Sequence, residues 1–199
     1  MVFDFNKLGL WQLVFHLICS VVLTDAMIPG LPGANQKTWT YEVKSMEAHS
    51  ADESILKFDI SIERVSRGVY AISGSVTLNV DVYEDHPCDI EGGAFRSNNG
   101  VNDYKILPFK VPRQHIITAM NTFYKDMLMD SLSECSNLPV FDDKFEPPLR
   151  KGVYSLEKCQ FSQDGFPNHM SEGFYKTEMF GNGYVDWSLT VVVQVEYVH

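Results

Sequence analysis

The stretch "FYKTEMFGNGYVDWSLTVVVQVEYV", from Phe174 to Val198, decides the fold. Its second half places an apolar or aromatic side chain at every other position, and a period of two residues is typical of a half-buried β-strand. Asn182 and Gly183 precede this strand and tolerate the positive φ angles of a tight turn. The stretch therefore predicts an antiparallel hairpin. The side chains that share one face of its second strand are Val185, Trp187, Leu189, Val191, Val193, Val195 and Tyr197.

A second hairpin is predicted earlier in the chain. "LKFDISIE", residues 56–63, and "SGSVTLNVDVY", residues 73–83, both alternate apolar and polar side chains, and "VSRG", residues 65–68, favours a turn between them. Strands that follow one another through short turns, with few helices, favour two packed layers of sheet. The predicted fold class is therefore mostly β, an antiparallel β-sandwich or cup.

One segment has helical rather than strand periodicity. In "PRQHIITAMNTFYKDMLMDSL", residues 112–132, the side chains of Ile116, Met120, Phe123 and Met127 fall on one stripe of a helix. Pro112 suits the first turn of a helix, where no backbone N–H is needed. The sequence therefore predicts one short helical segment over residues 112–132.

The first 26 residues have the pattern of a secretory signal peptide. A short head is followed by the apolar run "LGLWQLVFHLICSVVL" and then by "TDA", with small residues where a signal peptidase cleaves. A membrane anchor is the alternative, but the run is short and is interrupted by Gln12 and His16. We expect cleavage after Ala26, a flexible lead-in over residues 27–37, a single domain over residues 38–199, and a secreted, extracellular protein.

The charge and the cysteines exclude some function classes. The formal net charge is −10, which is unfavourable for binding to phosphate backbones, so we expect no nucleic-acid partner. Cys88, Cys135 and Cys159 follow the predicted signal peptide, and their spacings are too long and irregular for a structural zinc site. Three cysteines allow at most one internal disulfide. We predict Cys135–Cys159, because it would join the helical segment to the sheet, and Cys88–Cys159 is the alternative.

The sequence contains no catalytic motif. It lacks a Gly-x-Ser-x-Gly elbow, a His-Glu-x-x-His zinc motif and a Gly-rich phosphate loop. The acidic pair Asp142–Asp143 is interpreted as solvated loop charge. We therefore expect a protein that is not an enzyme, with no cofactor and no metal. A hydrolase with a cysteine nucleophile and a distant histidine stays as the weaker alternative.

The run "EPPLRKGVYSLEKCQFSQDGFPNHMSEGFYKTEMF", residues 146–180, carries a family resemblance. The residues that carry it are Lys151, Gly152, Tyr154, Ser155 and Leu156 of one strand, then Pro167, Gly173 and Tyr175 around the next loop. In order and spacing it resembles the C-terminal half of the ganglioside GM-two activator protein, within the ML lipid-recognition superfamily. Within that superfamily the chain is most similar to the insect contact-chemosensory B family.

This resemblance implies a cup-shaped β-sandwich around an internal apolar cavity, and binding without catalysis. It also implies a role in contact chemosensation or pheromone perception, with a receptor as a further partner. The ganglioside activator has many more cysteines, so its disulfide frame is not carried over.

The methionine and phenylalanine residues of the helical segment and of residues 161–180 fit this expectation. Methionine is flexible and polarizable and suits surfaces that contact varied apolar molecules, and ligand sites are mostly apolar. We expect the ligand to be a lipid or another hydrophobic small molecule. Its predicted contacts are Met120, Phe123, Met127, Phe161, Phe166, Met170, Phe174, Met179, Phe180 and Trp187.

The loop "FPNHMSEG", residues 166–173, is predicted to lie at the rim of the cup. Its tip would be His169 and Met170, and Gly165 and Gly173 could absorb a change of backbone conformation. Met170 could then contact a membrane surface transiently or cover the cavity mouth. Two alternatives to the carrier stay open, an adhesive or structural sandwich without a ligand and a lipid-presenting cofactor for a hydrolase.

Overall fold

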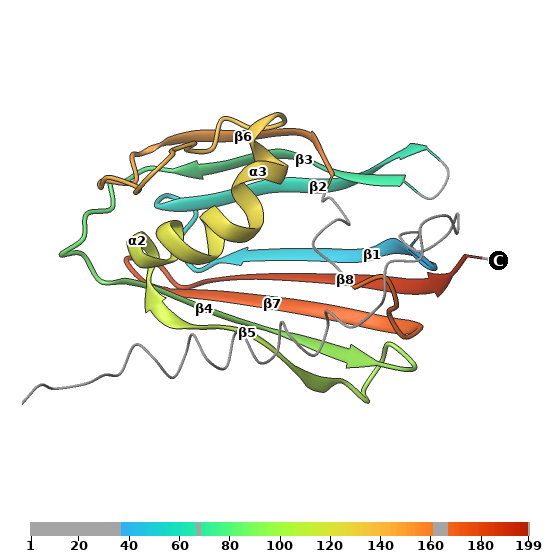
Figure 1. The fold of residues 1–199 in the computed structure, drawn as a ribbon. Coiled ribbons are helices and arrows are strands. Elements are labelled where there is room, and N and C mark those ends of the chain that lie inside the picture. The colour runs from blue at the N-terminus through green and yellow to red at the C-terminus, as the bar shows by residue number, and fades with distance from the viewer. Residues whose placement is uncertain (1–36, 67–68, 161–166, 199) are drawn as a thin grey trace, which may run out of the picture. The chain divides into compact units, whose positions relative to one another are not determined.

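The computed structural model describes residues 37–66, 69–160 and 167–198, which form two antiparallel β-sheets and one helical segment (Figure 1). The five-stranded sheet has the order β1 (Trp39–Ser50), β8 (Trp187–Tyr197), β7 (Gly173–Gly183), β4 (Cys88–Ser97) and β5 (Lys105–His115). The three-stranded sheet has the order β2 (Leu56–Ser66), β3 (Val69–Leu78) and β6 (Gly152–Cys159). The predicted fold class, mostly β with two antiparallel layers, is confirmed.

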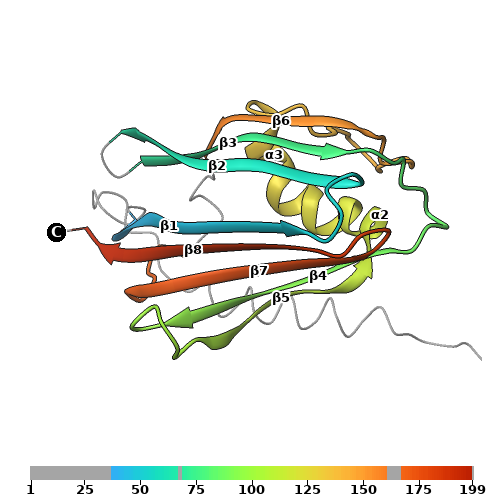
Figure 2. The ribbon, with the colours of Figure 1, turned by 180° about the vertical axis from the view of Figure 1, so that it is seen from behind.

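The two sheets lie one above the other, and the helical segment lies between them along one side (Figures 1 and 2). The rings of Phe58 in β2 and Trp187 in β8 contact each other across the layers, with centroids 5.9 Å apart. Residues that pair directly across neighbouring strands share a face, so this contact identifies the inner face of each sheet. Leu189, Val191 and Val193 follow Trp187 on that face by strand alternation. The predicted apolar face of the last strand therefore faces the other sheet.

The turn between β7 and β8 lies further along the chain than the sequence predicts. Asn182 and Gly183 belong to β7, where they pair with Asp89 and Cys88 of β4, and residues 184–186 make the connection. Gly183 has a φ of 136°, and a Cβ atom there would lie 1.8 Å from the carbonyl oxygen of Pro87. The glycine is thus required by the close approach of β4 and not by a turn. The predicted turn at Asn182–Gly183 is wrong because β4 pairs with β7 beyond it.

Strand pairing also moves two other predicted boundaries, the end of β3 and the start of the helix. β3 ends at Leu78, and Val82 instead forms an isolated antiparallel bridge to Leu149. The helix begins at Ile116 and not at Pro112, because residues up to His115 pair with β4. β5 lies at the edge of its sheet, where a proline is tolerated in a strand.

The helical segment is continuous but widens in its middle. It runs through α2 (Ile116–Ala119), the π-helix η1 (Met120–Leu128) and α3 (Met129–Ser133). A π-helix hydrogen-bonds five residues apart instead of four, so a stripe spaced for an α-helix drifts around it. Met120 is buried as predicted for a core-facing stripe, whereas Met127 is 48% exposed. Met129 and Leu132 are buried instead.

A hydrophobic core forms between the helical segment, the following loop and β6. Its buried members are Ile117, Met120, Tyr124, Met129, Leu132, Phe145 and Cys159. The disulfide Cys135–Cys159 joins the chain after α3 to the end of β6, and Cys88 is free. The predicted disulfide is confirmed and the alternative with Cys88 is excluded.

The first 36 residues, which contain the predicted signal peptide, lie outside the described residues, as do Phe161 and Phe166. Among the residues that are described, no helix is long and apolar enough to cross a membrane.

Candidate functional site

The inner faces of the two sheets carry apolar side chains that are only partly buried. In the middle of a filled sandwich such side chains would be buried, as they are in the core beneath the helix. Thr177, which pairs with Val191 and so shares its face, is exposed. Water therefore reaches the inner surface of the five-stranded sheet. The half-buried apolar residues that define this inner surface are Phe58, Ile60, Ile62, Val76, Met179, Trp187, Leu189, Val191 and Val193.

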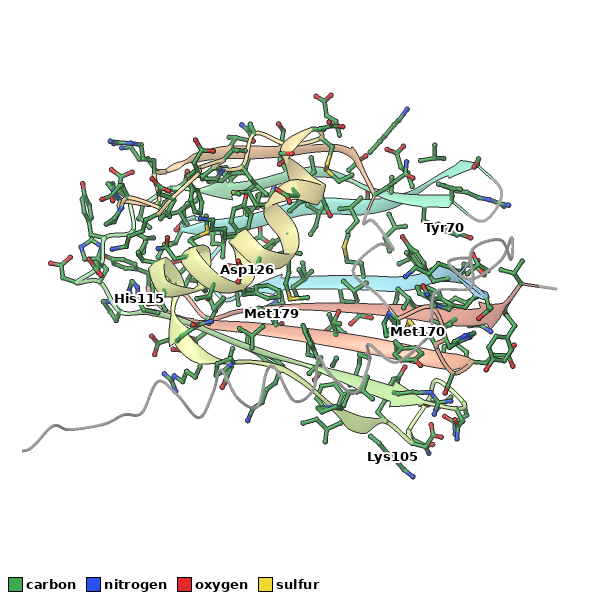
Figure 3. All side chains as sticks on the ribbon, viewed as in Figure 1. Tyr70, Lys105, His115, Asp126, Met170 and Met179 are labelled. Carbon is green, nitrogen blue, oxygen red and sulfur yellow. A yellow bond between two sulfur atoms is a disulfide. The ribbon has the colours of Figure 1, made fainter. Side chains whose placement is uncertain are left out.

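Glycines let two large side chains lie flat on this inner surface. A Cβ atom on Gly181 would lie 2.0 Å from Nε1 of Trp187, and one on Gly92 would lie 2.2 Å from Sδ of Met179. Each glycine is the direct cross-strand partner of the side chain that covers it. In the view of Figure 3 Met179 lies beneath the helical segment, and its pairing with Leu189 places it on the inner face. The indole and the thioether therefore both lie over glycines on the inner face and add to its apolar floor.

The helical segment is held firmly above this floor by the loop that follows it. The hydroxyl of Tyr124 donates to the carbonyl of Pro139 at 2.8 Å, and burial raises the pKa of Tyr124 to about 12. The backbone N–H of Phe145 donates to Oδ1 of Asn121 at 2.7 Å. Nζ of Lys125 donates to the carbonyls of Asp142 and Asp143, at 2.5 and 2.6 Å. The loop and the disulfide therefore fix the helix as one wall of the inner surface.

Two polar pockets lie where β8 ends, at the rim. The smaller, of about 190 Å³, is lined by Thr40, Tyr41, Glu42, Arg64, Tyr70, Gln194 and Glu196. The larger, of about 350 Å³, is lined by Asn98, Glu172, Gly173, Phe174, Gln194, Val195, Glu196 and Tyr197. Figure 3 shows that Tyr70 and Met170 lie at this end and His115 at the other. The rim is therefore polar, whereas the inner surface between the sheets is apolar.

The predicted ligand contacts are distributed over several environments. Met179 and Trp187 lie together on the inner surface, and Met120 is buried in the adjoining core. Phe123 is half-buried in η1, and Met170 is half-buried at the rim.

Strand alternation places two other predicted contacts on the outer face of the five-stranded sheet. Phe180 pairs with Ser188 on that face and is 43% exposed. The ring of Phe174 lies against Gly100, where a Cβ atom would be 2.8 Å away. The structure therefore does not bring these two rings to Met179 and Trp187.

Arg96 is the functional candidate that the sequence analysis missed. It pairs with Tyr175, which in turn pairs with Val193, and this places Arg96 on the inner face of β4. Its guanidinium carbon lies 6.0 Å from the centroid of the Tyr175 ring. Nη2 donates to the carbonyl of Glu172 at 2.6 Å. An arginine at the rim end of an apolar surface can bind a polar or anionic group.

The surroundings of the Cys88 thiol and of the histidines bear on the hydrolase alternative. Burial raises the pKa of the Cys88 thiol, and the charge of Asp89 raises it further, so the thiol is protonated at neutral pH. Nδ1 of His115 accepts from the N–H of Ile117, and its Nε2 lies 2.7 Å from the carbonyl of His86. In the described parts of the chain no histidine is hydrogen-bonded to a serine or cysteine side chain. The hydrolase alternative would need such a pair.

One family model matches the chain. It carries the description "Protein of unknown function (DUF1091)" and covers residues 91–177, from β4 through the helical segment and β6 into β7. The matched region includes Arg96, the helical wall and both cysteines of the disulfide. No curated protein matches the chain.

Proposed function

We propose that the protein is an extracellular carrier that binds a lipid or another hydrophobic molecule on the inner surface between its sheets, without catalysis. The observation that carries the proposal is the partial exposure of the apolar inner residues, with Thr177 exposed among them. A bound chain would cover this surface. Each buried CH₂ group contributes about 0.8 kcal/mol, so a dozen of them contribute roughly 10 kcal/mol before ordering costs.

The resemblance to the insect contact-chemosensory B family supports a narrower version of this proposal. In that version the carrier acts in contact chemosensation, delivering a hydrophobic pheromone to a receptor. Export is part of it, with a signal peptide that is cleaved after Ala26. N-terminal sequencing of protein secreted from a eukaryotic host should begin at Met27. Intact retention of residues 1–26 would contradict the extracellular assignment.

Two neighbouring valines of β8 provide a matched test of ligand binding. Val191 lies on the inner surface and Val192 on the outer face, and both are half-buried. We expect Val191→Asn to weaken binding of a fluorescent fatty-acid probe about 10-fold, because an amide in an apolar site loses its water without gaining partners. Val192→Asn should bind the probe as the wild type does. Equal loss in both variants would contradict an inner binding surface.

Extraction of the purified secreted protein followed by mass spectrometry tests the proposal without a chosen probe. A stoichiometric hydrophobic molecule should be recovered from wild-type protein and in smaller amount from Val191→Asn. The adhesive alternative draws its support from the outer face of the five-stranded sheet, where Ile106 is 68% exposed and Phe180 is 43% exposed. Absence of any co-purified molecule, together with no probe binding, would favour that alternative.

A further inference from the structure

Arg96 has hydrogen-bonding capacity that the described protein atoms do not use. Its Nε atom is buried and has no acceptor among the described residues. It takes part in none of the ion pairs found there, although the chain has a net charge of −10. A buried donor without an acceptor is unfavourable. Nη2 donates to the carbonyl of Glu172, so Nε is the donor left without an acceptor, and the guanidinium has no anionic partner among the described residues.

The strand register places Arg96 at one end of the apolar inner surface. Arg96 lies level with Val193 of β8, and the inner face then continues past Thr177 and Met179. It reaches Trp187, whose ring contacts Phe58 of the other sheet. The Phe58–Trp187 contact joins the two layers and so ends the surface on that side.

The length of this surface follows from strand geometry. Val193 follows Trp187 by six positions along β8, and a strand rises about 3.3 Å per residue, which gives about 20 Å. Carbon–carbon bonds of about 1.5 Å advance an extended hydrocarbon by roughly 1.25 Å each. The distance along β8 from the level of Arg96 to Trp187 therefore matches the length of an extended chain of about 16 carbons.

We propose that the ligand is a long, unbranched carboxylic acid whose carboxylate pairs with Arg96 and whose tail ends at the Phe58–Trp187 contact. This inference rests on the proposed carrier function and names its ligand class. Arginine binds carboxylates through charge-assisted hydrogen bonds, often two in parallel. A carboxylate supplies the anionic partner that the guanidinium lacks among the described residues, and the hydrocarbon chain covers Thr177, Met179 and the valines of β8.

Displacement of a neutral fluorescent probe by palmitic acid and by 1-hexadecanol tests the head-group assignment. The two ligands have the same chain and differ in the charged group. Wild-type protein should bind palmitic acid at least 10-fold more tightly, because charge-assisted hydrogen bonds are the stronger ones. Arg96→Gln should remove most of that preference and leave the affinity for 1-hexadecanol unchanged. Arg64→Gln, at the rim pocket of the other sheet, serves as the matched control and should keep the preference.

The outcomes separate the two proposals. Equal binding of acid and alcohol by wild-type protein, or loss of the preference in Arg64→Gln but not in Arg96→Gln, would overturn the assignment of Arg96 while leaving the carrier function standing. Failure of both ligands, and of hexadecane, to displace any probe would overturn the carrier function itself. Melting temperatures of the variants show whether a loss of binding is a loss of fold.

A series of saturated acids from 10 to 22 carbons tests where the tail ends. Phe58→Ala removes one ring of the end contact and should shift the preferred length toward longer acids. Gly181→Ala places a methyl group where the Trp187 indole now lies, 2.0 Å from its Nε1, and should shift the preference toward shorter acids because the indole must rise into the inner space. Phe180→Ala, on the outer face, should leave the preference unchanged. An unchanged optimum in both inner variants would overturn the tail placement.

Discussion

The hydroxyl of Tyr70 donates a 2.5 Å hydrogen bond to Oε1 of Glu42 and thereby joins the two sheets at the rim. Tyr70 is the second residue of β3 in one layer, and Glu42 lies in β1 of the other. Nζ of Lys44 donates to the second oxygen of the same carboxylate at 2.7 Å. Ionised Glu42 accepts from both donors, whereas a protonated carboxyl carries its proton on one of these two oxygens and accepts less strongly from Lys44 and Tyr70.

We predict that this connection makes the stability of the protein depend on acid pH. The hydrogen bonds from Lys44 and from Tyr70 lower the pKa of Glu42 below its ordinary value of 4.5. A lowered pKa in the folded state gives stability that is present above pH 4.5 and is lost as the pH falls through the folded-state pKa. Urea unfolding at pH 7 should find Glu42→Gln less stable than wild type, and the difference should shrink by pH 3.

The neighbouring Glu47→Gln, also in β1 and exposed, serves as the control and should follow the wild-type pH dependence. A difference between Glu42→Gln and wild type that stays constant from pH 7 to pH 3 would mean that the ionisation of Glu42 does not contribute.

The disulfide should contribute a measurable part of the stability. Cys135 and Cys159 are 24 residues apart, and closing a loop of that length stabilises the folded state by about 3 kcal/mol. We expect urea unfolding of the double variant Cys135→Ser, Cys159→Ser to give a free energy of unfolding lower by that amount, and reductant to have no further effect on it. Cys88→Ser should unfold like wild type and should keep the response to reductant. Loss of that response in Cys88→Ser would mean that Cys88 is part of a bridge.

Asn121 should hold the helical wall in place. Its Oδ1 accepts from the N–H of the buried Phe145, and its Nδ2 donates to the carbonyl of Ile117 at 2.9 Å. Asn121→Ala leaves the Phe145 N–H without its partner, and we expect a loss of about 1–3 kcal/mol in the free energy of unfolding. Thr122→Ala, on the exposed side of the same turn, should change it by less than about 0.5 kcal/mol. Similar losses in both variants would indicate a general weakening of η1.

Strands in which apolar and polar side chains alternate strictly could be predicted from the sequence. Strands without that alternation could not be predicted. β8 shows its inner face because each inward position from Trp187 to Val195 is apolar or aromatic. β4, with the sequence "CDIEGGAFRS", has no such pattern, since its inner positions include Gly92 and Arg96. Its strand character comes from pairing with β7 on one side and β5 on the other. Strand pairing also sets the ends of β3 and β5, and pairing cannot be predicted from a local sequence pattern.

The candidate site was predictable only in part, for related reasons. The sequence places Phe174, Met179 and Phe180 in one predicted site because they are apolar and close together in the chain. Alternation along β7 instead puts the two rings on the opposite face from the methionine. That separation could have been derived from residue numbers alone, because even and odd positions of one strand face opposite ways. The position of Arg96 on the inner face could be predicted only with knowledge of its partner strand. Its inner position follows from its pairing with Tyr175, and nothing in "GGAFRS" indicates a face.

We predict that Met170 controls the entry of the ligand at the rim. Its segment is tied to the start of β1, since Nε1 of Trp39 donates to the carbonyl of Pro167 at 2.9 Å and Oγ1 of Thr38 donates to that of Asn168 at 3.2 Å. Met170 itself is half-buried just beyond these contacts. We predict that Met170→Asp slows loading of a fluorescent fatty-acid probe several-fold in stopped-flow experiments and leaves the melting temperature nearly unchanged, because a partly exposed rim side chain contributes little to the core.

Met127→Asp makes the same chemical change on the exposed side of η1, where the parent methionine is 48% exposed, and should load at the wild-type rate. Equal loading rates for all three proteins would mean that Met170 does not control entry, and a much lower melting temperature for Met170→Asp would place it in the folded core instead.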